Sequence, residues 1–161
     1  MIDAVAIAAL LPHGSGLSLL DAITFWDEAT LRASSRRHLR PTHPLGCARV
    51  QGANCLKVSV DEVSVDEVSS VQLIEYAAQA AGVHIRLLAP AEKKLRGGVL
   101  AMVRDIKLNA ETLGNSNAEL NIEVVRRGSL GLGLLYDFVV TRAFATLASG
   151  KLGIVLRVGD S

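Results

Sequence analysis

The chain has 161 residues, of which 50% are hydrophobic and 4% aromatic, and its formal net charge is +1. This length suits a single domain over residues 1–161, and so large an apolar fraction argues against disorder. The balanced charge gives no reason to expect nucleic acid or a membrane surface as a partner, and no apolar run reaches the ~20 residues of a membrane-spanning helix.

The N-terminal part predicts a short helix and a β-hairpin. Residues 4–11 are apolar and are followed by Pro12, whose ring removes a backbone donor, so one or two helical turns are expected there. Residues 17–26 and 30–39 predict two strands, joined by a turn at residues 27–28.

Charge and cysteine usage indicate the compartment. The apolar start carries Asp3 and no basic residue, which does not fit a secretory signal. Cys47 and Cys55 form no Cys-x-x-Cys motif, and no second cysteine pair accompanies them. We therefore expect a cytoplasmic protein with free thiols.

The middle of the chain predicts a loop and then the longest helix. Residues 40–55 contain two prolines and two glycines, which is typical of a loop, and residues 58–68 contain the repeat VSVDE-VSVDE. A helix is expected from Asp66 to about Leu88, with Ser64 and Glu67 at capping-box spacing. Apolar residues occupy almost all of its faces, which is typical of a core helix around which a sheet can wrap closely.

The C-terminal half predicts an antiparallel meander. Residues 119–124 alternate strictly between polar and apolar. The expected strands cover residues 99–109, 118–127, 132–142 and 144–158. Turns are expected at residues 95–98, 114–117 and 128–129, with a hairpin turn or bulge at 149–150. One long helix in a curled antiparallel sheet satisfies this order, so the expected fold class is α+β with a hot-dog arrangement.

Glu75 is the most informative residue for function. It lies within the predicted helix among apolar neighbours, where a carboxylate must be paired or remain protonated with a raised pKa. Such carboxyl groups serve as general acids near neutral pH. Gln72 and Gln79 share its helix face, so the three side chains form a polar stripe. A solvent-facing or ion-paired stripe is the alternative interpretation, and periodicity alone weighs the two about equally.

Four histidines are candidate bases, and they differ in position. His13 and His43 lie in predicted loops, and His38 belongs to a basic run. His84 lies nine residues after Glu75, on roughly the opposite side of the helix, and is expected to be a packed or capping residue. No histidine pair has helix-face metal spacing, so no metal site is expected. Nor does the sequence contain a Gly-x-Ser-x-Gly elbow, a complete dinucleotide fingerprint or a phosphate loop.

Two segments in register resemble the hydroxyacyl carrier-protein dehydratases. Leu11-Pro12-His13 followed by Leu19-Leu20-Asp21 is similar to their "LPH…LLD" opening, and residues 73–80, LIEYAAQA, are similar to their central helix motif. The likeness is greatest to the subgroup found with aryl polyene pathways. Typical fatty-acid dehydratases place the catalytic histidine in a "GHFPGxPxxPG" loop, of which residues 42–46 keep only fragments. The polyene-type subgroup lacks that loop and keeps the LPH histidine. The resemblance therefore favours His13 as the base, with His43 as the alternative.

The resemblance implies a β-elimination without a cofactor. A histidine would remove the proton α to a thioester carbonyl, and protonated Glu75 would donate a proton to the leaving 3-hydroxyl. Backbone N–H groups near Ser69, Ser70 and Val71 would polarise the carbonyl, with Gln79 also in the substrate-binding site. The apolar helix face would form an acyl tunnel.

The resemblance also implies partners and leaves alternatives. The substrate would arrive on the phosphopantetheine of an acyl carrier protein, and two hot-dog subunits, identical or related, would join their sheets in a dimer. The basic run at residues 36–40 is more typical of a solvated face than of a rim that attracts an acidic carrier. A hot-dog thioesterase and a non-catalytic partner subunit are the competing functions, because fold resemblance does not fix function.

Overall fold

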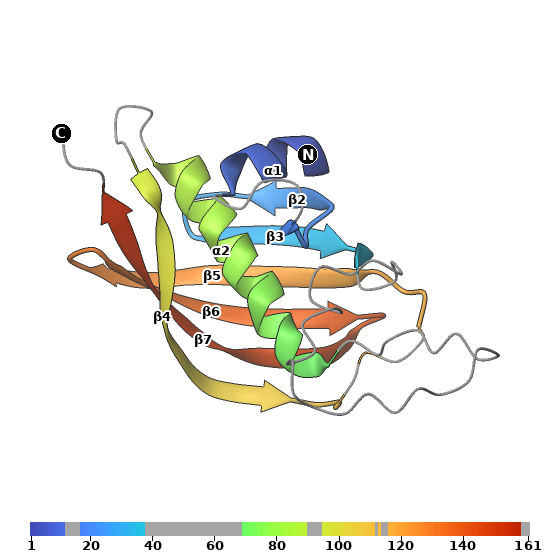
Figure 1. Ribbon diagram of the computed structural model, residues 1–161. Coiled ribbons are helices and arrows are strands. Elements are labelled where there is room, and N and C mark those ends of the chain that lie inside the picture. Colours follow the sequence, from blue (N-terminus) through green and yellow to red (C-terminus); the bar gives the residue numbers. More distant parts are fainter. Residues whose placement is uncertain (12–16, 38–68, 90–94, 112, 114–115, 159–161) are drawn as a thin grey trace, which may run out of the picture.

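The computed structural model describes residues 1–11, 17–37, 69–89, 95–111, 113 and 116–158 (Figure 1). His13, His38, His43, both cysteines, the VSVDE repeat and the predicted Ser64–Glu67 cap lie outside these residues. The strands are β1 (Ile2–Asp3), β2 (Ala22–Trp26), β3 (Thr30–Ser35), β4 (Leu95–Leu108), β5 (Leu120–Leu130), β6 (Gly133–Arg142) and β7 (Ala145–Val158). The helices are α1 (Ala4–Leu10), the 3₁₀ turn η3 (Ser70–Gln72) and α2 (Leu73–Leu88).

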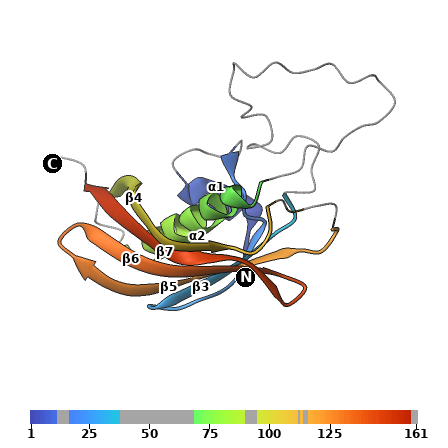
Figure 2. The same cartoon turned by 90° about the horizontal axis from the view of Figure 1, so that it is seen from below.

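The seven strands form one antiparallel sheet in the order β1-β2-β3-β5-β6-β7-β4. Helix α2 lies obliquely across one face of this sheet, and α1 lies beside it over β2 (Figure 1). Seen from below, the sheet curls around α2 (Figure 2). The expected order of hairpin, long helix and antiparallel meander is therefore confirmed.

The core lies between α2 and the concave face of the sheet. Strands β5 and β6 contribute alternate residues to it, as a half-buried strand should. The helix contributes large side chains such as Leu73 and Tyr76 together with the buried alanines 77, 80 and 81, which let the sheet approach closely. The expectation of an apolar helix enclosed by a sheet is thereby confirmed.

The longest helix begins later than predicted. Ser69 has extended backbone angles, and its hydroxyl accepts a bond from the N–H of Val71, so the first helical turn starts at Ser70 rather than at Asp66. The predicted end at Leu88 is correct, since Ala89 is extended before Pro90. The two hairpin strands are also shorter than predicted, because residues 17–21 and 36–37 run outside the sheet.

Three predicted turns are corrected by the sheet. Residues 95–98 belong to β4, and Gly128–Ser129 belong to β5, whose turn into β6 lies at Gly131 with a φ of +59°. Strand β7 passes through Ser149–Gly150 without turning, and the irregularity lies in β4 opposite them. A side chain at Gly150 would overlap Ile106 and lie 3.1 Å from Phe138 Cε1, so glycine is required there by close packing.

Candidate active site

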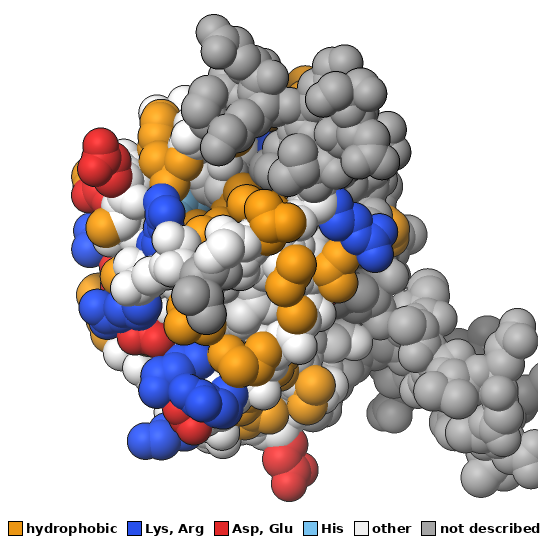
Figure 3. Space-filling model, turned by 90° about the vertical axis from the view of Figure 1, so that its left-hand side faces the viewer, with side chains coloured by type: hydrophobic (Ala, Val, Ile, Leu, Met, Phe, Trp, Pro, Cys, Tyr) orange, Lys and Arg blue, Asp and Glu red, His pale blue; other side chains and the backbone are white. Residues whose placement is uncertain are grey.

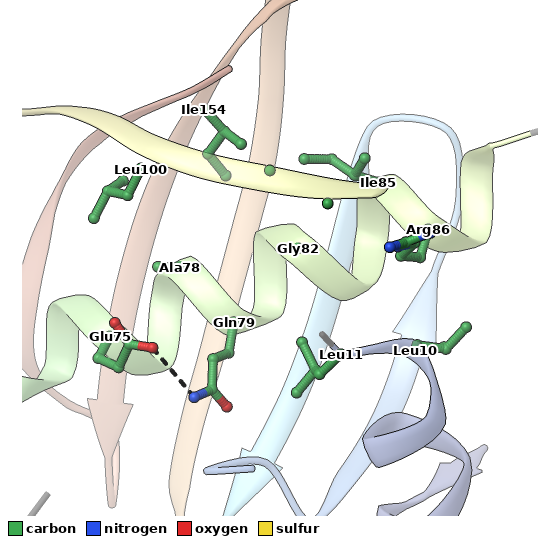
Figure 4. Close-up of a pocket in the computed structure, with 12 residues that line it drawn as sticks. Leu10, Leu11, Glu75, Ala78, Gln79, Gly82, Ile85, Arg86, Leu100 and Ile154 are labelled. Carbon is green, nitrogen blue, oxygen red and sulfur yellow. Dashed lines mark hydrogen bonds between the residues drawn. The ribbon is translucent and has the colours of Figure 1, made fainter. Parts of the chain in front are cut away.

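Glu75 lies in the first turn of α2, half-buried at one end of a pocket of about 160 Å³. The pocket runs between α2, the end of α1 and β4 (Figure 4). Its described lining residues are Leu10, Leu11, Glu75, Ala78, Gln79, Gly82, Ile85, Arg86, Gly97, Gly98, Leu100 and Ile154. The arrangement places one carboxyl group at the mouth of a mainly apolar groove, which suits an acyl chain.

Gln79 connects Glu75 to the segment before β2. Its Nε2 donates to Glu75 Oε1 at 3.2 Å and to the Leu17 carbonyl at 2.9 Å, and its Oε1 accepts from the Leu19 N–H at 2.8 Å. Gln79 is only 7% exposed, so these bonds are sheltered from water. The Glu75–Gln79 part of the predicted polar stripe is thus a hydrogen-bonded unit that fixes the Leu17–Leu19 backbone beside the carboxyl group.

The described residues that come before and after residues 12–16 lie near Glu75. Leu11 lines the same pocket, and Leu17 is bonded to Gln79. His13 itself and His43 lie outside the described residues, so the choice between them stays a prediction.

His84, the one histidine in the described part of the chain, is a packed residue, as predicted. It is fully buried, with Nδ1 3.1 Å from the Tyr136 hydroxyl and Nε2 2.7 Å from the Asp27 carbonyl. The carbonyl can only accept, so Nε2 carries the proton and Nδ1 accepts from Tyr136. Burial lowers the pKa of His84 and raises that of Tyr136 to about 12, so both stay neutral at pH 7.

The residues before α2 are already tied to other groups. The N–H and the hydroxyl of Ser70 both donate to the Glu111 carbonyl, at 2.9 and 3.1 Å, and Ser70 is buried. The N–H of Val71 donates to Ser69 Oγ at 3.4 Å, a long bond that a stronger acceptor could replace. The N–H of Val71 is therefore more easily released than that of Ser70.

An ion pair that was not predicted from the sequence stabilises the segment before β2. Asp21 accepts from the Arg37 guanidinium at 2.8 Å and from the Arg36 N–H at 2.7 Å. Ser35 donates to the Leu19 carbonyl, which lies one peptide from the bond to Gln79. Arg37 is thus not part of a solvated face, and Asp21 stabilises the segment that Gln79 holds. The signal was the opposite charge of two residues at the base of one hairpin.

Glycines and a cation in the pocket wall were also missed. Gly82 and Arg86 follow Glu75 on one face of α2, at the seventh and eleventh positions, a helical spacing that could have been recognised.

Within the described residues, no group of three or more His, Cys, Asp or Glu side chains could hold a metal ion. No helix of this part of the chain is long and apolar enough to cross a membrane.

Comparison with known proteins decides the family. The ApeP-like family, described as ApeP dehydratase, matches residues 5–157. The chain belongs to this family. None of the curated proteins matches the sequence. The predicted resemblance to dehydratases of the aryl polyene subgroup is therefore confirmed.

Solved structures confirm the hot-dog fold. The dehydratase heterocomplex ApeI:P from Xenorhabdus doucetiae has a TM-score of 0.70 and 16% identity, covering 94% of this chain and 90% of that one. A mutant thioesterase, PA1618, from Pseudomonas aeruginosa has a TM-score of 0.58 and 11% identity, and the match covers 98% of this chain and 95% of that one. A hypothetical thioesterase with coenzyme A from Streptococcus pneumoniae has a TM-score of 0.56 and 11% identity, and the match covers 87% of this chain and 88% of that one. At these identities the likeness shows the fold and not the reaction.

Proposed function

We propose that this chain removes water from a 3-hydroxyacyl thioester carried on an acyl carrier protein, giving a trans-2-enoyl thioester. The observation that carries the proposal is the placement of the Glu75 carboxyl, fixed by Gln79 at one end of an apolar groove. Membership of a dehydratase family supports the reaction class.

The proposed reaction is a β-elimination in which each group has one task. The imidazole of His13 takes the proton from C2, the electron pair forms the C2–C3 double bond, and the C3–oxygen bond breaks. Protonated Glu75 gives its proton to the departing hydroxyl, which leaves as water. Proton exchange with solvent then restores both groups.

Two backbone features support this assignment. The segment that precedes β2 is bonded to Gln79 on one side of His13, and Leu11 lines the groove on the other side. The N–H of Val71, bonded to Ser69 at 3.4 Å, is the group that we assign to the thioester oxygen as it gains enolate charge.

The proposed assembly uses the free edge of β4. This strand is 14 residues long and, among the strands that the structure describes, pairs only with β7. Val99, Leu100 and Val103 are each more than a third exposed on it. Figure 3 views the left-hand side of Figure 1, where the first part of β4, the end of β7 and the β5–β6 hairpin lie, and shows hydrophobic side chains gathered on this face beside Lys and Arg. A long apolar edge strand is a site for pairing with another strand, and we assign it to a related hot-dog subunit.

Mass spectrometry of a 3-hydroxyacyl carrier protein incubated with the purified protein tests the reaction. Wild-type protein should produce a species lighter by one water, and Glu75→Gln should not, although it keeps the size and a bond to Gln79. Appearance of the free carrier thiol would indicate the thioesterase instead, with the same carboxyl group activating water. Water loss that occurs only with an added related subunit, and survives Glu75→Gln, would assign this chain as a non-catalytic partner.

A further inference from the structure

The groove that begins at Glu75 ends at a second charged side chain. Arg86 lies eleven positions further along α2, about 16 Å away along the helix axis. Figure 4 shows Glu75, Gln79, Gly82 and Arg86 following one another along the helix. Glu75 and Arg86 are the charged members of the described lining, and the wall between them is apolar or glycine except for Gln79.

Gly82 keeps the groove open between its two ends. Glycine inside a helix is destabilising relative to alanine, so an interior glycine calls for an explanation. Close packing does not require it, because an added Cβ would find Leu11 Cδ2 at 3.9 Å, an ordinary contact distance. The space above Gly82 belongs to the pocket. A passage for a ligand chain explains the residue better than packing does.

Arg86 can bind a ligand without giving up its place in the protein. A cation in the last helical turn is favoured by the helix dipole, which accounts for its position but not for its side chain in the groove wall. A guanidinium carries five N–H donors, enough for protein and ligand together. We propose that Arg86 binds an anionic oxygen group that the substrate carries about 16 Å from the carbon reacting at Glu75.

Two parts of the substrate could supply that anion, and the inference rests on the proposed function for their identity. About thirteen bonds separate phosphorus from sulfur in a phosphopantetheine arm, which spans roughly 15 Å when extended. The arm phosphate therefore has the required reach. A carboxylate at the far end of the acyl chain presents the same chemistry to a guanidinium.

Titration calorimetry with three thioesters tests the inference without requiring turnover. The probes are S-hexanoyl-4′-phosphopantetheine, S-hexanoyl pantetheine and S-(15-carboxypentadecanoyl) pantetheine. They carry a phosphate, no anion, and a terminal carboxylate that lies about thirteen bonds, roughly 16 Å, from C3. The full chain is used in the assembly in which it purifies. Arg86→Gln should weaken the binding of at least one anionic probe about tenfold and change the affinity for the neutral probe by less than about twofold. Loss on the first probe assigns the carrier arm, and loss on the third assigns the acyl end.

Two further variants sharpen the result. Arg127→Gln removes an exposed arginine paired to Asp137 outside the groove, and it should leave all three affinities unchanged. Gly82→Ala should raise the unfolding midpoint, because alanine is the better helix former. It should also weaken the binding of the anionic probe that Arg86 selects, because the methyl group enters the groove. Equal affinity of the wild type for charged and neutral probes would overturn the inference, as would equal loss of all probes in Arg86→Gln. Anion preference in a wild type that removes no water would retain the inference and reject the dehydratase.

Discussion

The Glu75–Gln79 pair and His84 share the helix α2 but differ in surroundings. Glu75 and Gln79 lie near its start, with Glu75 half-buried at the pocket. His84 lies near its end and is fully buried, with both ring nitrogens bonded to the protein. Within the described residues, Glu75 accepts one side-chain hydrogen bond, from Gln79, whereas a carboxyl group has room for several.

The difference separates a structural polar group from a reactive one. His84 has no pocket beside it among those described and no ring nitrogen left for a substrate. Its bonds join α2 to the β2–β3 turn and to β6. Glu75 contributes less to the fold and faces space that a ligand can enter. Residue type alone would have favoured the histidine, which is the commonest general base.

Glu75→Gln should give the largest effect on turnover and almost none on stability. Loss of a general acid lowers the rate by about 10²–10⁴. Half-buried at the groove mouth, the substituted amide should change the free energy of unfolding by less than about 0.5 kcal/mol. Steady-state water loss and urea unfolding measure the two quantities. A loss of stability comparable to that of a His84 variant would contradict the comparison.

His84→Ala should show the reverse pattern. Removing the ring leaves the Asp27 carbonyl and the Tyr136 hydroxyl without their partner and opens a cavity, so we expect a loss of about 3 kcal/mol. Turnover per folded molecule should stay within about twofold, measured well below the unfolding midpoint. Tyr136→Phe is the matched control, because it removes one of the two bonds and should cost about 1 kcal/mol.

Gln79→Leu should fall between these extremes, because Gln79 belongs to both the fold and the site. Three bonds are lost, and the Leu19 N–H is left without its acceptor, which should cost about 2 kcal/mol. Turnover should fall about 10- to 100-fold, since small misplacements of catalytic groups have effects of this size. Gln79→Glu keeps the acceptor for Leu19 but loses both donors. Normal turnover in a destabilised Gln79→Leu protein would limit Gln79 to a structural role.

The sequence predicted the elements whose periodicity is strong. Alternation in β5 and the long apolar run of α2 identified both elements, and the four-residue spacing identified the Glu75–Gln79 pair. Local turn chemistry failed at Gly97 and Gly98, because pairing with β7 overrides it. Gly98 is a strand residue whose added side chain would overlap Ile154. Its glycine reflects close packing across the sheet, which a single sequence does not reveal.

The site was predictable only in part, because some of its contacts join residues that are far apart in the sequence. Glu75 and Gln79 are neighbours along one helix, whereas the Leu17–Leu19 backbone reaches them from about sixty residues away. The ion pair of Asp21 with Arg37 also depends on how the hairpin strands end. Contacts of this kind are set by tertiary packing and not by local pattern.

The smallest expected effect is a pH dependence of stability that His84 produces. Burial lowers the pKa of His84 in the folded protein below its ordinary value of 6.5. Below pH 6.5 the imidazole of His84 therefore binds a proton more readily in the unfolded chain than in the folded protein. The stabilisation from this residue is complete well above pH 6.5 and is lost as the pH falls further, with an upper limit of about 1.4 kcal/mol at pH 5.5 set by the ordinary pKa of 6.5.

Urea unfolding at pH 7.5 and 5.5 isolates this contribution when wild type is compared with His84→Gln. Other titrating groups are common to both proteins, so the difference between the two pH dependences belongs to His84. Wild type should lose more stability than the variant over this interval, by up to about 1.4 kcal/mol. Equal losses would mean that the folded protein accepts the proton as readily as the unfolded chain. Burial would then not hold the ring neutral, and the contrast between a structural histidine and the carboxyl group at the pocket would lose its physical basis.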